Sequence, residues 1–286
     1  MLRLRLQTAL VLIAILLGII IFSRDLPILF FVVGNCFVIL GIREFTSMTG
    51  GIRWLGISGG ILVFSSAFVS ALGTDFLPVH LWALASPEWM QASIFLSIAG
   101  IFLFQATRRQ HENSVLRIST TLAGILYVAW LLSFLPRITY YSSERFPSLD
   151  GRMYVFFLFL VVKVTDSAAY FIGSKWGRHK LIPRLSPKKT VEGAVAGVLI
   201  GGFSALGGKY LFGLSEITPA GSLTLGFILG ATAVGADLAE SLLKRATGHK
   251  DSGNSLPGLG GILDLMDSVF FTTPLLFLYM KLILKL

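Results

Sequence analysis

The amino-acid sequence predicts an all-α integral membrane protein, a polytopic bundle of about nine transmembrane helices. Three observations lead to this fold class: 54% of the 286 residues are hydrophobic, only 14% are charged, and the apolar residues fall in long runs. A soluble globular domain usually carries about a quarter charged residues. Apolar runs near 20 residues match the ~30 Å hydrocarbon core of a bilayer, where helices satisfy their own backbone polar groups.

Nine apolar segments are expected to cross the membrane as helices. In order, they cover Gln7–Phe22, Leu26–Ile42, Leu55–Leu72, Ala92–Phe104, Leu116–Leu135, Tyr154–Ile172, Val191–Leu211, Leu223–Glu240 and Ser268–Leu286. The fourth segment is short, and the sixth contains Lys163 and Asp166. The first segment follows Arg3 and Arg5 and lacks a small-residue cleavage site, so we interpret it as a retained anchor.

The distribution of lysine and arginine predicts the orientation, because cytoplasmic loops carry an excess of both residues. One set of loops carries most of them: Arg3, Arg5, Arg43, Arg53, Arg108, Arg109, Arg117, Lys175, Arg178, Lys180, Arg184, Lys188, Lys189, Lys244, Arg245 and Lys250. We therefore expect a cytoplasmic N-terminus, with the C-terminus outside if nine segments span. The absence of a transit peptide favours a bacterial inner membrane. The net charge of +9 does not indicate nucleic-acid binding, since the basic residues lie in short loops between apolar runs.

One polar segment follows the eighth apolar run and continues to the ninth. Asp237, Glu240, Ser241, Lys244 and Arg245 have spacings that place them on one face of a helix. Further along, Asp264 and Asp267 follow glycines 258, 260 and 261, which permit tight turns and a close approach to a ligand. Carboxylates of this kind suit Mg²⁺ that also binds substrate phosphates, and Lys244, Arg245 and Lys250 could neutralise those phosphates.

A second polar segment begins inside the sixth apolar run. Asp166 lies within a predicted span, where an ionisable residue indicates a functional site by default. It is followed on the cytoplasmic side by a run with Ser186, Lys188, Lys189, Thr190 and Glu192.

Each group taken alone also has a structural interpretation. Lys163 could pair with Asp166, and Asp237 and Glu240 could pair with Lys244 along their helix. Asp264 and Asp267 could interact with the N-terminal dipole of the last helix, and Lys188 with Lys189 could be a topology signal. Because all of these groups fall on one side of the membrane, we favour a shared functional site.

A long pattern in these segments carries a family resemblance. It consists of Ser241, Lys244, Arg245, Lys250, Asp251, Gly253, Leu256, Pro257, Gly260, Gly261, Asp264 and Asp267 in their present spacing. This pattern resembles the signature of the phosphatidate cytidylyltransferase (CDP-diacylglycerol synthase) family, and the run from Ser186 to Gly193 is similar to a second family segment. The matches cover about residues 160–270. The chain departs at Leu259 and Leu265, where the family usually has His and Arg.

The resemblance implies transfer of CMP from CTP to phosphatidic acid in the bilayer, which gives CDP-diacylglycerol and pyrophosphate in phospholipid biosynthesis. It implies Mg²⁺, with K⁺ as a further ion, held by Asp237, Asp264 and Asp267, which with Lys250 form the expected catalytic set. The expected substrate-binding residues are Asp166, Ser186, Lys188, Lys189, Thr190, Glu192, Ser241, Lys244 and Arg245. Residues 1–150 would be a scaffold of transmembrane helices, with a homodimer as one arrangement, and residues 151–286 the catalytic region.

Other function classes remain as alternatives. An ion-coupled transporter could use Asp166, Lys163 and Asp237 as an ion path, although it should present polar groups from both sides of the membrane. The spaced motif of a CDP-alcohol phosphotransferase is absent from the sequence. A non-catalytic relative of the enzyme is the third alternative, because Leu259 and Leu265 remove two phosphate contacts.

Overall fold

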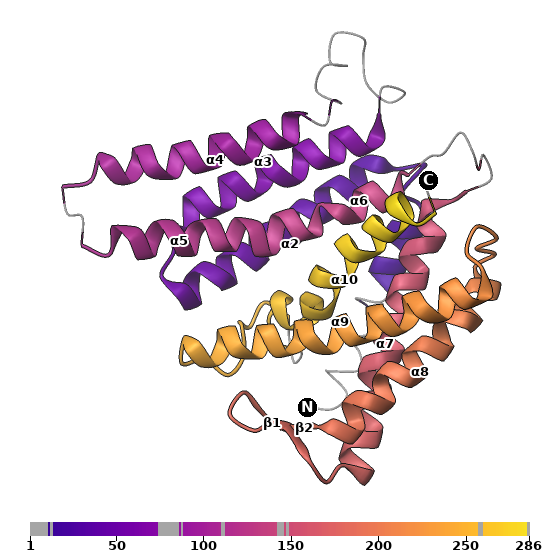
Figure 1. Ribbon diagram of the computed structural model, residues 1–286. Helices are drawn as coiled ribbons and strands as arrows, with labels where there is room; N and C mark the ends of the chain where they lie inside the picture. The colour runs from indigo at the N-terminus through magenta and orange to yellow at the C-terminus, as the bar shows by residue number, and fades with distance from the viewer. Residues whose placement is uncertain are drawn as a thin grey trace. The chain divides into compact units, whose positions relative to one another are not determined.

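A computed structural model (Figure 1) describes residues 11, 14–73, 86, 88–109, 112–141, 146, 149–256 and 260–284. In this part of the chain, eight helices are long and apolar enough to cross a membrane. They confirm the all-α membrane fold and correspond one to one with the second to ninth predicted spans. The first predicted span, Gln7–Phe22, lies only partly within the described residues, of which 14–21 are helical.

The chain divides into two compact units, each described here by itself. The first contains Met1–Tyr140 and His249–Leu265, and the second contains Tyr141–Gly248 and Met266–Leu286. A short segment that precedes the last helix therefore folds with the N-terminal helices, although it is distant from them in the sequence.

The first unit contains four of the spans. They are α2 (Pro27–Thr49), α3 (Arg53–Leu72), α4 (Glu88–Ala106), and a composite span made of α5 (Ser114–Gly124), the π-helical turn η3 (Ile125–Trp130) and α6 (Phe134–Thr139). Helix α2 begins with Pro27, whose fixed φ suits the first helical position, and ends at Gly50 with a left-handed φ of 75°. The hydroxyl groups of Ser66 on α3 and Ser93 on α4 lie 3.0 Å apart and link these two helices by a hydrogen bond.

The second unit is built on α7 (Gly151–Trp176), α8 (Val191–Leu211) and α9 (Pro219–Ala246), together with most of α10 (Ile262–Leu282). Buried Gly193, Gly197 and Gly201 recur every four residues along α8. This spacing of small residues lets two membrane helices approach closely, and here the partner is α7. A Cβ atom on Gly197 would lie 2.8 Å from the carbonyl oxygen of Thr165 and 2.9 Å from the Cβ of Ala169.

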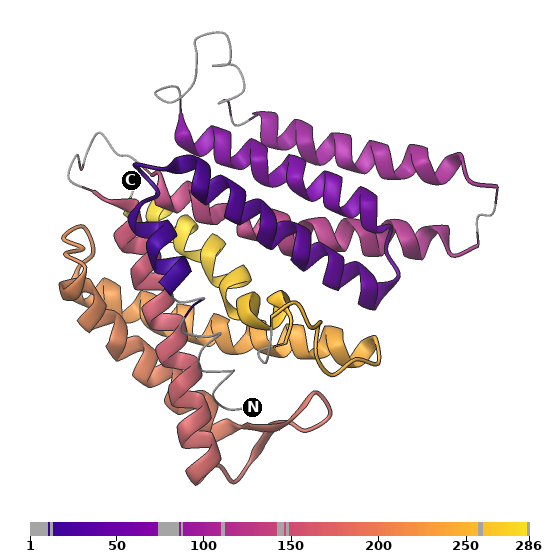
Figure 2. The ribbon, with the colours of Figure 1, turned by 180° about the vertical axis from the view of Figure 1, so that it is seen from behind.

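A small β-hairpin connects α7 to α8 and projects to the side of these helices (Figure 2). Strand β1 (Lys180–Ile182) pairs antiparallel with β2 (Ser186–Thr190), with Lys180 opposite Thr190. The polar run expected in a loop is therefore a strand. Its backbone hydrogen bonds give Lys188 and Lys189 a defined position.

The helices that carry predicted site residues are longer than the apolar runs. Helix α9 continues to Ala246 where the predicted span ends at Glu240, and α10 begins at Ile262 where the predicted span begins at Ser268. The polar residues thus extend transmembrane helices by about a turn or more, because each additional residue adds one backbone hydrogen bond to an existing helix.

The close contact between α7 and α8 leads to a first prediction. Gly197→Ala should lower the thermal midpoint in detergent, because overpacking against backbone and Cβ atoms typically costs about 1–3 kcal/mol. Gly207→Ala on the same helix is the matched control, since no atom beyond the adjoining backbone of α8 lies within 4 Å of its added Cβ. This control should be neutral or slightly stabilising. Equal midpoints for the two variants would contradict the proposed packing.

Candidate active site

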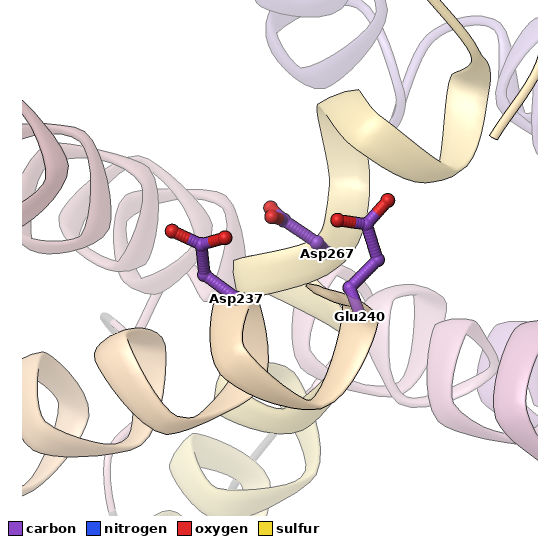
Figure 3. A group of neighbouring side chains, drawn as sticks. All are labelled: Asp237, Glu240 and Asp267. Atoms are coloured by element: carbon purple, nitrogen blue, oxygen red, sulfur yellow. The ribbon is translucent and has the colours of Figure 1, made fainter. Parts of the chain in front are cut away.

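Three carboxylates gather in the second unit (Figure 3). Asp237 and Glu240 are one turn apart on α9, and Asp267 comes from α10. One ligand oxygen from each residue lies within 4.8 Å of the others. Asp237 is half-buried, and the side chain of Glu240 is only 2% exposed. The sequence placed Asp237 and Asp267 in one site and Glu240 on the same helix face, but it did not identify Glu240 as a ligand.

Two lysines pair with this acidic cluster. Lys189 of β2 forms an ion pair with Asp237, and the Lys244 ammonium lies 2.6 Å from a Glu240 carboxylate oxygen. The intrahelical pairing considered for Lys244 therefore occurs with Glu240, while Asp237 pairs with a lysine from the hairpin.

The cluster fits a bound divalent cation. Three carboxylates so close together repel one another, and a cation held among them relieves this repulsion. Carboxylate oxygens are the ligands that hard cations such as Mg²⁺ and Ca²⁺ prefer, at about 2.0–2.6 Å from the ion. Oxygens on opposite sides of such an ion are about 4–5 Å apart, which the observed spacing matches.

A pocket of about 590 Å³ lies in the same unit. Its volume is within the range of small-molecule sites. Six predicted site residues line it: Asp166, Ser186, Lys188, Lys189, Thr190 and Asp237. Lys180, Tyr170 and Ser174 also line the pocket and were not predicted. Lys180 lies opposite Thr190 in the hairpin, and only this strand pairing, which the sequence does not reveal, brings it to the pocket.

The base of the hairpin is fixed by two of the predicted residues. The Thr190 hydroxyl accepts a hydrogen bond from the backbone N–H of Gly193 at 3.2 Å and caps α8. The Glu192 carboxylate accepts the backbone N–H groups of Arg178 and His179, both at 3.1 Å, and lies 2.6 Å from Nδ1 of His179. Glu192 does not line the pocket. These contacts hold β2 in place, so Lys188 and Lys189 are presented to the pocket by a rigid element.

The remaining residues of the α9 face have distinct surroundings. Ser241 is buried next to Glu240. The Nε group of Arg245 donates to the carbonyl oxygen of Leu185 at 3.3 Å and so contacts the turn of the hairpin. Inside α7, the Lys163 ammonium lies 3.7 Å from Asp166, as the structural interpretation expected, while Asp166 also lines the pocket.

Asp264 and Lys250 belong to the first unit. Lys250 is exposed. Oδ2 of Asp264 accepts hydrogen bonds from the backbone N–H of Gly261 at 2.8 Å and from Ser252, through its N–H at 3.1 Å and its hydroxyl at 2.9 Å. Asp264 therefore organises the start of α10, and its metal role remains a prediction. Leu265 ends this unit, and Leu259 lies outside the described residues.

Comparison with known proteins identifies the family. A model described as the cytidylyltransferase family matches residues 3–283 of the chain. The chain belongs to the cytidylyltransferase family. A protein of Synechocystis sp. named phosphatidate cytidylyltransferase is 31% identical over 275 residues, which cover 86% of each chain. A protein of the same name from Staphylococcus saprophyticus is 33% identical over 237 residues, 83% of this chain and 84% of that protein. One from Bacillus subtilis is 43% identical over 146 residues, 50% of this chain and 53% of that protein.

The acidic cluster leads to a prediction about cation binding. Without a divalent cation, Asp267→Asn should be more stable than the wild type, because one of three mutually repelling charges is removed. With saturating Mg²⁺ or Mn²⁺, the wild type should gain about 2–4 kcal/mol from ligand binding and the variant much less. Thermal midpoints measured in detergent with EDTA and with each cation would show this crossover.

Glu216→Gln is the control for this experiment. Glu216 is also a carboxylate of the second unit, but it accepts the Tyr154 hydroxyl at 3.1 Å and is not part of the cluster. It should keep the wild-type response to cations. An equal stabilisation by Mg²⁺ in wild type and Asp267→Asn would rule out the cluster as a cation site.

Proposed function

We propose that this chain transfers a cytidylyl group from CTP to phosphatidic acid and releases pyrophosphate. The observation that carries the proposal is the acidic cluster together with a pocket that Asp237 shares with two lysines of β2, in a membrane-spanning member of the cytidylyltransferase family. Anionic substrates and a cation require such a combination of charges in one place.

The chemistry needs charge neutralisation more than proton transfer. Phosphatidic acid carries a phosphate monoester whose second pKa is about 6, so it is largely dianionic at neutral pH. One of its oxygens forms a bond to the α-phosphorus of CTP while the bond from that phosphorus to the bridging oxygen of pyrophosphate breaks. The obstacle is the mutual repulsion of two polyanions, and catalysis then consists of positioning and electrostatic stabilisation.

The chain's own residues have complementary parts in this reaction. Asp237, Glu240 and Asp267, with Asp264 as the sequence predicts, would hold Mg²⁺, and K⁺ would be a further ion of the site. When bound, the metal offsets phosphate charge and stabilises the pyrophosphate leaving group. Lys189 touches both the acidic cluster and the pocket, so we assign it and Lys188 to the phosphates of CTP. Ser186 and Thr190 would contact the same phosphates or the phosphatidate headgroup.

The proposal extends to the setting of the enzyme. We propose that the pocket opens to the cytoplasm, where CTP is available, and that the chain lies in a bacterial inner membrane with the acyl chains of the lipid beside the spans. Residues 1–150 would serve as scaffold and supply any homodimer contacts, and residues 151–286 would carry the catalytic groups. We expect no nucleic-acid partner.

A radiolabelled CTP-to-lipid transfer assay on purified protein tests the function. The wild type should form labelled CDP-diacylglycerol from CTP and phosphatidic acid only with Mg²⁺. Asp237→Asn and Asp267→Asn should each lower the rate by at least about 100-fold, because each removes charge that stabilises the transition state. Glu216→Gln should stay near the wild-type rate. Liposome uptake without CTP consumption would instead favour a transporter.

Leu259 and Leu265, where this chain departs from the family pattern, give a separate prediction. Leu259→His combined with Leu265→Arg restores two groups that can contact phosphate. We propose that other lysine and arginine side chains already supply these phosphate contacts. The double variant should then change the transfer rate by less than about tenfold, which corresponds to about 1.4 kcal/mol in the activation free energy. A much larger gain would identify the natural chain as a weakened enzyme.

A further inference from the structure

Glu44 is a buried carboxylate in a part of the chain to which the proposed function assigns no reacting group. It lies on α2, near the end of that helix, and is only 4% exposed. Burial of a carboxylate is costly unless hydrogen bonds or charges compensate for the lost water. The partners of Glu44 therefore indicate why a charged residue is present there.

Those partners belong to the start of α10 and lie in the same unit as Glu44. Oε1 accepts the backbone N–H of Ile262 at 3.0 Å, and Oε2 accepts the N–H of Leu263 at 3.1 Å. Ile262 and Leu263 are the first two residues of α10, and the first N–H groups of a helix have no acceptor within it. Glu44 thus caps α10 from another helix, and its charge also suits the positive end of the helix dipole.

Ser252 joins this cap to Asp264. The Ser252 hydroxyl lies 3.2 Å from Oε2 of Glu44 and 2.9 Å from Oδ2 of Asp264, so one hydroxyl lies between two carboxylates. Asp264 also accepts the N–H of Gly261, which directly precedes α10, in the manner of a capping-box acid. Two carboxylates consequently account for three successive N–H groups, those of Gly261, Ile262 and Leu263.

The glycines of the family signature surround the same carboxylates. A Cβ atom would lie 2.7 Å from Oε1 of Glu44 at Gly253, and 2.5 Å from Oε2 of Glu44 at Gly261. Gly260 has a φ of +102°, which favours glycine, and its Cβ would lie 2.8 Å from Oδ2 of Asp264. Glycine at 253 is thus required by Glu44, a residue more than 200 positions away, and glycine at 261 by the Ser252 hydroxyl together with Glu44.

We infer that Glu44 is a positioning residue that fixes the segment preceding α10 and the first turn of this helix. The first turn holds Asp264, and Asp267 follows three residues later on the same helix, so the Glu44 cap fixes the turn from which α10 continues to both carboxylates. This inference rests on the proposed function for its catalytic consequence. Its structural content, the capping of Ile262 and Leu263, stands independently.

Glu44→Gln is the first test, because the amide has the shape of the carboxylate but a single acceptor oxygen and no charge. Hydrogen exchange at the Ile262 and Leu263 amides should become at least about tenfold faster, as expected for loss of a charge-assisted bond. The dissociation constant for Mn²⁺, measured by electron paramagnetic resonance, should rise about 10- to 100-fold, as for other residues that orient metal ligands. In the transfer assay, the Mg²⁺ concentration at half-maximal rate should rise by a similar factor.

Asp150→Asn is the matched control. Asp150 also places a carboxylate at the start of a transmembrane helix, where it accepts the backbone N–H of Arg152 at 3.0 Å and caps α7. Its loss should reduce stability without changing Mn²⁺ affinity or the Mg²⁺ dependence of transfer. This comparison separates a general effect of losing a helix cap from a specific effect on the acidic residues of α10.

Gly261→Ala disturbs the cap of α10 by a different substitution. It replaces Glu44→Gln as the test if that variant does not fold. It leaves Glu44 chemically intact but introduces a methyl group against the Ser252 hydroxyl and the Glu44 carboxylate, the two groups that hydrogen-bond to each other in this cap, so it should weaken Mn²⁺ binding in the same way. Glu44→Asp, which keeps the charge on a shorter side chain, should lie between Glu44→Gln and the wild type.

The possible failures are distinguishable. Unchanged amide exchange and unchanged Mn²⁺ affinity in Glu44→Gln and Gly261→Ala would overturn the role of Glu44, while an active wild type would leave the proposed function standing. A wild type without CTP-to-lipid transfer would overturn the proposed function. In that case, faster exchange and weaker Mn²⁺ binding in the two variants would still support Glu44 as the residue that positions α10.

Discussion

The mutual repulsion of three carboxylates dominates the candidate site. Asp237, Glu240 and Asp267 come within 4.8 Å of one another on helices that otherwise serve as apolar spans. Such an arrangement persists only where cations compensate for the charge, and the ion pairs with Lys189 and Lys244 contribute to this compensation. This concentration of carboxylate oxygens suits the cluster to a divalent ion and, through that ion, to phosphates that the carboxylates would otherwise repel.

The hairpin between α7 and α8 gives this charge a counterpart of opposite sign. Lys189 lies on a strand whose base is fixed by the Thr190 cap and the Glu192 contacts, and it pairs with Asp237. A lysine on a flexible loop would lose more side-chain and backbone entropy on binding a phosphate than one already held in place. Thr190 and Glu192, predicted as substrate contacts, thus have a demonstrable role in positioning the residues that face the pocket.

The sequence was sufficient for the spans and for several residues that line one pocket. Apolar runs predicted the eight long helices of the described residues, and ionisable residues inside or next to these runs pointed to Asp166, Lys188, Lys189 and Asp237, which line one pocket. Periodicity could not predict the hairpin, because its pairing depends on contacts between strands. It also could not identify Glu44, since an acidic residue directly after Arg43 resembles an ordinary span end. The role of Glu44 depends on hydrogen bonds to residues about 200 positions away in the sequence.

The two acidic residues at the start of α10 illustrate how one motif can serve two physical purposes. The sequence left open whether Asp264 and Asp267 bind a metal or interact with the helix N-terminus. Oδ2 of Asp264 accepts the N–H of Gly261, so the second interpretation applies to that oxygen, whereas Asp267 joins the acidic cluster with Asp237. A carboxylate that binds a cation well must be held rigidly. Asp264 and Glu44 accept hydrogen bonds from the N–H groups at the start of α10 and so fix the turn that precedes Asp267 in the sequence.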